Sequence, residues 1–172
     1  MKNSRHQQAI FDDWLREHAA ILHHVANGFA TGADRHDLMQ ELMLALWRAV
    51  PAFRAASLPS TFIFRVTHNA ALTWKRAERG YRRRLDIFEQ EPALAPAAIA
   101  GPGDETPADS LELLYSAIRS LEPLDRSLVL LQLDGVSYAQ IAEIHGLTES
   151  NVGVRLNRIK HKLTAIIQEK TS

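Results

Sequence analysis

The stretch that most constrains the fold runs from Gly135 to Leu163, with the sequence GVSYAQIAEIHGLTESNVGVRLNRIKHKL. It predicts two short helices joined by a tight turn. Ser137 and Gln140 have the spacing of a capping box at the start of the first helix. Gly146 can supply the positive φ that a tight helix C-terminus requires, and Thr148 can cap the second helix. This order of signals is typical of a helix-turn-helix.

The second helix of this pair has two chemically different faces. Apolar residues recur at steps of four, three and four, which predicts one buried stripe of Val152, Leu156, Ile159 and Leu163. The opposite face starts with short polar groups and continues with arginines, which suits base edges and phosphates in a major groove. An ordinary helical hairpin with a solvated basic face is the alternative. The predicted DNA-reading face consists of Ser150, Asn151, Val154, Arg155 and Arg158, flanked by Lys160 and Lys162.

Composition excludes several other classes of protein. A chain of 172 residues can form one large domain or two small ones. It has no cysteine, so it can form neither disulfides nor cysteine-ligated zinc sites. His18, His23 and His24 lack the spacing of metal ligands, and we expect no metal. The N-terminus lacks the apolar core of a signal peptide, and no apolar run reaches membrane-spanning length, so we expect a cytoplasmic protein.

The formal net charge is zero, but the charges are unevenly distributed along the chain. Residues 51–84 contain eight Arg and Lys against one acid, whereas residues 85–110 contain six acids and no Arg or Lys. In the basic block, aromatic residues are interleaved with cations, as a surface that binds single-stranded nucleic acid requires. A basic block beside an acidic one indicates a localised anion-binding surface.

The remaining segments predict helices and a linker. We expect a helix over 9–26 that Asn27-Gly28 breaks, and a second helix, capped by Asp34 or Asp37, that Pro51 ends. A third should run from Ser60 or Thr61 to about Glu78. Residues 85–110 contain four of the seven prolines and are expected to form a linker, spanning roughly 85 Å at most when extended. Two further helices, over 111–121 and 124–134, should support the helix-turn-helix. In the second of them we expect largely buried side chains at Leu128, Val129, Leu131 and Leu133.

With both halves laid out, the chain resembles a sigma factor of the extracytoplasmic-function (ECF) type over about residues 9–168. The first half of the resemblance lies in DLMQELMLALW at 37–47, in Phe53-Arg54 and in TFIFRVTHNA at 61–70. The second lies in the segment from Leu121 to Leu163. His68 stands where the family usually has arginine. The resemblance implies an all-α fold of two small helical domains joined by a flexible linker.

The resemblance also implies roles for individual residues. The face that docks on the clamp helices of RNA polymerase would comprise Asp37, Gln40, Glu41 and Trp47. Phe53, Phe64 and Asn69 match residues that form the pocket for a flipped base of the minus-ten element. Further contacts to minus-ten DNA would come from Arg54, Arg65, Thr73, Lys75 and Arg76, and the DNA-reading face of the last helix would read the minus-thirty-five element.

These observations predict a promoter-specificity subunit without catalytic activity or cofactor. Its expected domains are residues 1–84, the polymerase and minus-ten domain, and residues 111–172, the minus-thirty-five domain, with 85–110 as the linker. Its expected partners are core RNA polymerase, promoter DNA and an anti-sigma factor, without membrane insertion. Two alternatives remain at this point: a helix-turn-helix regulator that acts without polymerase docking, and a sigma mimic that sequesters an anti-sigma factor.

Overall fold

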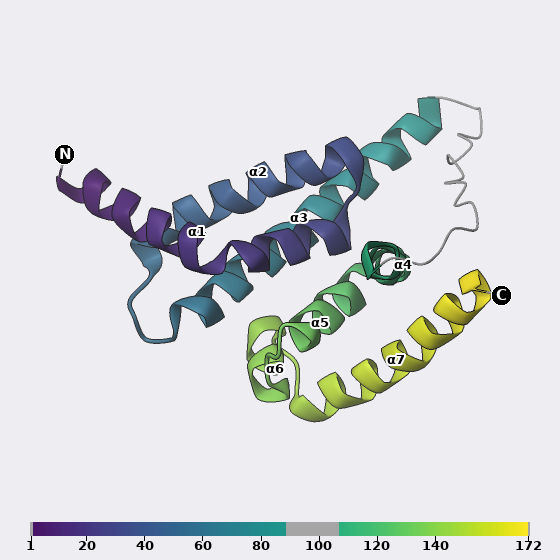
Figure 1. Cartoon of the computed structure of the whole chain (residues 1–172). Helices are drawn as coiled ribbons and strands as arrows, with labels where there is room; N and C mark the ends of the chain where they lie inside the picture. Colours follow the sequence, from purple (N-terminus) through teal and green to yellow (C-terminus); the bar gives the residue numbers. More distant parts are fainter. Residues whose placement is uncertain (1, 89–106, 172) are drawn as a thin grey trace.

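The computed structural model describes residues 2–88 and 107–171 (Figure 1). Within these residues it contains seven α-helices, one short 3₁₀ helix and no strand, which confirms the all-α prediction. No helix in these two ranges is long and apolar enough to cross a membrane. The elements are α1 (Lys2–Phe29), α2 (Gly32–Ala49), η1 (Val50–Ala52), α3 (Pro59–Phe88), α4 (Pro107–Arg119), α5 (Pro123–Leu133), α6 (Tyr138–His145) and α7 (Glu149–Thr171).

The three N-terminal helices pack side by side as a bundle (Figure 1). Leu38, Leu42 and Leu46 form the buried stripe of α2 and are 0% exposed. Pro51 lies at the start of η1, so α2 ends just before it, as expected. The third helix is longer than expected: α3 starts at Pro59 and continues to Phe88, ten residues beyond Glu78.

The predicted break at Asn27-Gly28 was wrong, because α1 continues to Phe29. Glycine is tolerated inside a helix at a cost of about 1 kcal/mol, and here its missing side chain makes room for a neighbour. A Cβ atom on Gly28 would lie 2.5 Å from Leu130 Cδ1 on α5. The irregular point of α1 is instead His18, whose backbone is non-helical.

The helix-turn-helix is confirmed in detail. Ser137 and Gln140 form the capping box of α6, and Gly146 adopts the left-handed conformation with φ 66°. The Asn151 N–H donates to Thr148 Oγ1 at the start of α7 (3.2 Å). The expected burial of Leu133 was wrong: it is 56% exposed, while Leu130 is buried.

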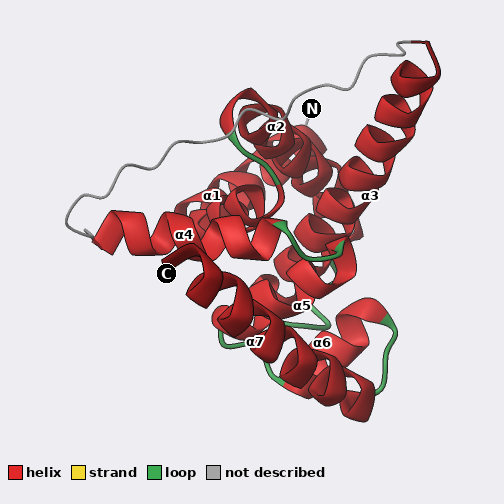
Figure 2. Cartoon of the chain, turned by 90° about the vertical axis from the view of Figure 1, so that its right-hand side faces the viewer, coloured by secondary structure: helices red, strands yellow, loops and turns green. Residues whose placement is uncertain are grey.

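The two halves of the chain pack directly on each other (Figures 1 and 2). Helix α1 contacts α4 and α5, and α3 contacts α5 and α6. Gly28 of α1 meets Leu130 of α5 at this boundary, and Arg119 of α4 donates to the Asn27 carbonyl oxygen (2.9 Å). We call this packed form the closed arrangement.

Candidate nucleic-acid interface

The predicted polymerase face lies on the side of α2 that points away from the core. Asp37, Gln40 and Glu41 are exposed, and the leucine stripe on the other side of the helix is fully buried. Trp47 differs from these three residues. Its ring packs edge-on against Phe11 of α1 at 5.4 Å, and its carbonyl oxygen accepts a hydrogen bond from Gln7 (2.8 Å). The structure therefore groups the three polar residues and places Trp47 in the contact with α1.

The exposed side of α3 next to α2 brings together three of the predicted minus-ten residues. Asn69, Thr73 and Arg76 are exposed at steps of four and three, so they form one stripe. Thr73 Oγ1 donates to the Asn69 carbonyl oxygen (2.9 Å). Asn69 and Thr73 also line an open groove between α2 and α3 of about 650 Å³, which Glu41 and Arg48 border on the α2 side.

The other predicted residues of α3 lie elsewhere on the helix. At 3.6 residues per turn, Phe64 is about 140° around the helix axis from Asn69. Arg65 Nη2 donates to Glu143 Oε1 of α6 (2.7 Å), so this arginine faces the C-terminal half. Lys75 is paired with Glu78 one turn along the same helix (2.5 Å). The structure thus divides the minus-ten set into an outward stripe and residues that are already engaged within the protein.

The loop before α3 carries the remaining two residues of that set. Arg54 is exposed, whereas Phe53 is partly buried in an aromatic cluster. The Phe53 ring lies 5.3 Å from the ring of Trp14 on α1 and 5.2 Å from that of Phe62 on α3. Ala55 next to them has a φ of 54°, which is uncommon for a residue other than glycine.

The predicted DNA-reading face of α7 is largely free. Ser150, Asn151, Val154, Arg158 and Lys160 are exposed, and the stripe of Val152, Leu156, Ile159 and Leu163 is buried. An open hollow of about 430 Å³ runs along the start of this face. Arg155 is half-buried, because its guanidinium donates to Asn151 Oδ1 (3.0 Å) and to Asp125 Oδ1 on α5 (3.1 Å).

Three polar residues meet at the centre of the boundary between the two halves. Ser127 Oγ of α5 lies 2.6 Å from His68 Nδ1 of α3 and 2.9 Å from His145 Nε2 of α6. Burial, and secondarily the neighbouring His145, lowers the pKa of His68 to about 3. Burial lowers the pKa of His145 to about 4. Both imidazoles are therefore neutral at neutral pH. Sequence reasoning missed this cluster; its only signal was His68 at a position where the family usually has arginine.

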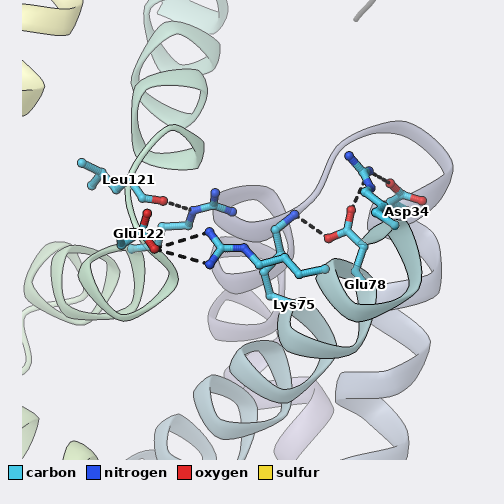
Figure 3. A network of polar contacts seen from close by, with 8 residues as sticks. Asp34, Lys75, Glu78, Leu121 and Glu122 are labelled. Atoms are coloured by element: carbon cyan, nitrogen blue, oxygen red, sulfur yellow. Dashed lines mark hydrogen bonds and ion pairs between the residues drawn. The ribbon is translucent and has the colours of Figure 1, made fainter. Parts of the chain in front are cut away.

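Further along α3, ion pairs connect this helix with α2 and with Glu122 at the start of α5 (Figure 3). Glu78 accepts from Lys75 (2.5 Å) and Arg82 (2.6 Å), and Arg82 also lies 4.0 Å from Asp34 of α2. Arg79 is paired with Glu122 at 3.4 Å. Part of the basic block that the sequence singled out therefore has acidic partners in the closed arrangement.

Two family models match separate parts of the chain. Residues 11–81 match the family model "Sigma-70 region 2", and residues 111–163 match "Sigma-70, region 4". The RNA polymerase sigma factor CarQ of Myxococcus xanthus is 26% identical over 94% of this chain and 91% of its own length. The ECF RNA polymerase sigma-E factor of Escherichia coli K12 is 27% identical over 81% of this chain and 77% of its own length.

Two solved structures have a similar fold. One is the sigma factor RpoE of Bartonella quintana in complex with the anti-sigma factor NepR, with a TM-score of 0.65 and 20% identity over 91% of this chain and 97% of that one. The other is CnrH in complex with the cytosolic domain of CnrY, with a TM-score of 0.62 and 21% identity over 94% of this chain and 90% of that one. Because both region models match in the expected order, this chain belongs to the sigma-70 family as an ECF-type sigma factor, a promoter-specificity subunit of RNA polymerase.

Proposed function

We propose that this sigma factor binds core polymerase through the Asp37, Gln40 and Glu41 face of α2 and reads the minus-ten element with the adjacent stripe of α3. The observation that supports this assignment is the groove between the two helices, which has Glu41 on one side and Asn69 and Thr73 on the other. A strand lying against α3 would pass directly beside a polymerase subunit bound to α2. Unpairing costs a few kcal/mol, which capture of an unstacked base in a protein pocket offsets.

The minus-thirty-five element would be read by the exposed face of α7, with its N-terminal residues toward the base edges and Lys160 toward the phosphates. In this proposal residues 1–84 form the domain that binds polymerase and the minus-ten element, and residues 111–172 form the domain that binds the minus-thirty-five element. Residues 85–110 are the linker between them. The protein would act in the cytoplasm beside RNA polymerase. It would contribute binding energy and no catalytic step of its own.

The closed arrangement cannot serve both elements at once. Sites named for positions minus ten and minus thirty-five are about 25 base pairs apart, or roughly 85 Å at 3.4 Å per pair. The longest helix in the described residues, α3, has 30 residues and is therefore about 45 Å long. We propose that the two halves separate when the protein joins polymerase, which would also release Arg65 from Glu143 and expose it to minus-ten DNA.

An anti-sigma factor is the proposed regulator, because both solved proteins with a similar fold are bound to a second protein chain. In one of these complexes the bound protein, NepR, is an anti-sigma factor. A protein that binds this chain in the closed arrangement would keep Arg65 paired and the two DNA-binding surfaces too close together for a promoter.

The test is a pull-down with core RNA polymerase followed by run-off transcription. Replacing Asp37, Gln40 and Glu41 together by alanine should reduce polymerase binding at least tenfold, because the change removes two charges and an amide from the docking face, while melting changes little. The matched control replaces Gln8, Asp12 and Asp13, which are exposed on α1 and have the same mixture of one amide and two acids. Equal polymerase affinity of both triple variants would show that α2 does not provide the docking face.

A further inference from the structure

Arg155 is held by oxygens from two helices before any DNA is present. Its Nε donates to Asn151 Oδ1 one turn back on α7 (3.0 Å), and its Nη1 donates to Asp125 Oδ1 on α5 (3.1 Å). The Asp125 side chain is only 17% exposed and that of Arg155 is 32% exposed. Asp125 thus fixes the guanidinium from the core side of the helix-turn-helix, at a partly desolvated position where an ion pair is stronger than on an open surface.

This arrangement determines which end of the Asn151 amide faces outward. A guanidinium has five N–H donors and no acceptor, so only the amide oxygen of Asn151 can face it. The oxygen is therefore turned toward Arg155, and the amide NH₂ of Asn151 points away from the guanidinium. The backbone N–H of Asn151 is occupied, because it donates to Thr148 Oγ1. With the oxygen turned toward Arg155, the groups that Asn151 and Arg155 direct outward are N–H donors.

Donors and acceptors distinguish the purines in the major groove. The usual asparagine contact to adenine needs both ends of the amide, because adenine presents an N6 amino donor beside the N7 acceptor. Guanine presents two acceptors, N7 and O6. A pair of side chains that offers only donors fits guanine and leaves the adenine amino group without a partner.

We propose that Asp125 is a positioning residue for promoter recognition: by fixing Arg155, it makes Asn151 a donor, so that this part of α7 selects guanine over adenine. This inference rests on the proposed placement of α7 in the major groove. It adds a residue outside the predicted DNA-reading face and names the chemical class of base edge that the face accepts.

The experiment uses the full-length protein with core RNA polymerase and a library of promoter duplexes randomised over the upstream element, read by sequencing the transcripts. The position that Asn151 contacts is the one whose preference disappears in Asn151→Ala. There, the wild type should favour guanine over adenine by about tenfold, the discrimination that one good two-bond contact provides. Asp125→Ala should bring the two purines within about threefold of each other, since the amide can then turn.

Two further variants test whether the effect of Asp125 comes from its hydrogen bond to Arg155 or only from its negative charge. Asp125→Asn retains an oxygen that can accept from Arg155 and should keep most of the guanine preference. Glu149→Gln removes an exposed acid from the first turn of α7 and should leave the preference unchanged. Thermal melting of each variant reports folding separately from base preference.

The outcomes distinguish this inference from the function on which it rests. Preference for adenine at the Asn151-dependent position, or an unchanged guanine preference in a folded Asp125→Ala protein, would overturn the role of Asp125 while leaving the sigma function intact. If the wild type yields no promoter-specific transcripts, or if no position responds to Asn151→Ala, the docking of α7 itself is wrong and the inference fails with it.

Discussion

At the scale of single residues, one close contact between the two halves of the molecule is apolar: Gly28 lies against the side chain of Leu130. Gly28 lies where α1 meets α5, and the Leu130 side chain occupies the space that a larger residue would need. Gly80 lies on α3, and a Cβ built there would have no neighbour within 4 Å. Gly80 lies inside α3 and Gly28 one residue before the end of α1, so both have helical backbone and differ mainly in their surroundings.

This difference gives the first residue-scale prediction. Gly28→Ala should lower the free energy of unfolding by about 1–3 kcal/mol, because overpacking forces Leu130 or the backbone to move. Gly80→Ala should raise it by up to about 1 kcal/mol through helix propensity alone. Urea denaturation followed by circular dichroism measures both values. Stabilisation by Gly28→Ala equal to that by Gly80→Ala would mean that α1 and α5 do not approach each other as closely in solution.

At the scale of elements, the sequence predicted best where local chemistry decides the structure. The capping box of Ser137 and Gln140, the left-handed Gly146 and the apolar stripe of α7 depend on residues within a few positions of one another. Prediction failed where a distant partner decides. Nothing near Gly28 indicates that Leu130 will pack on it. Leu133 is exposed although Leu130, one turn earlier on the same face of α5, is buried, because the neighbouring helices cover only the earlier turn.

The reading helix α7 supports a prediction that separates base contacts from phosphate contacts. Arg155→Ala should cost about 1–3 kcal/mol on the best promoter and relax the preference at one position. It should also lower the melting temperature, because it leaves the partly buried Asp125 without its cation.

The matched variant on the same helix is Lys160→Ala. Lys160 is exposed and expected near the phosphates, so its loss should weaken all promoters about equally and reduce the slope of log affinity against log salt by about 1. Salt titrations of both holoenzyme variants against matched and single-mismatch promoters measure these quantities. Indistinguishable titrations would contradict the proposed orientation of α7.

At the scale of the whole molecule, two domains could be predicted from the resemblance, but their packing could not. The groups that join the halves are far apart in the sequence: His68 and Ser127 by 59 residues, Arg65 and Glu143 by 78, and His24 and Asp134 by 110. Each is an ordinary residue in its own segment. Their significance appears only when α3 lies against α5 and α6, which brings two histidines to a buried serine.

This packing makes domain separation sensitive to pH. The closed arrangement holds His68 and His145 with pKa values of about 3 and 4, whereas separation would return both toward the ordinary value of about 6.5. The open form, in which the two halves are separated, therefore binds more protons than the closed arrangement below pH 6.5. The two neutral histidines contribute their full stabilisation of the closed arrangement above pH 6.5, and this contribution declines as the pH falls toward 4. The charged pair nearest to the cluster in sequence is Arg65 with Glu143. Asp134 acts in the opposite direction to the histidines, because burial raises its pKa in the closed arrangement, which therefore gains a proton more readily at acid pH.

We therefore expect the open fraction to rise between pH 7.5 and pH 5.5, with the open-to-closed ratio increasing by about tenfold for each histidine at pH 5.5. The protein has no cysteine, so Ala33→Cys on α2 and Asn157→Cys on α7 permit labelling for energy transfer between the halves, with circular dichroism to monitor helix content. His145→Gln removes one of the two titrating groups and should reduce the pH response to about that of a single histidine. The exposed His161, changed to glutamine, is the control and should leave the response unchanged. Energy transfer that stays constant from pH 7.5 to 5.5 in the wild type, or an equal response in both histidine variants, would contradict a closed arrangement held together at His68 and His145.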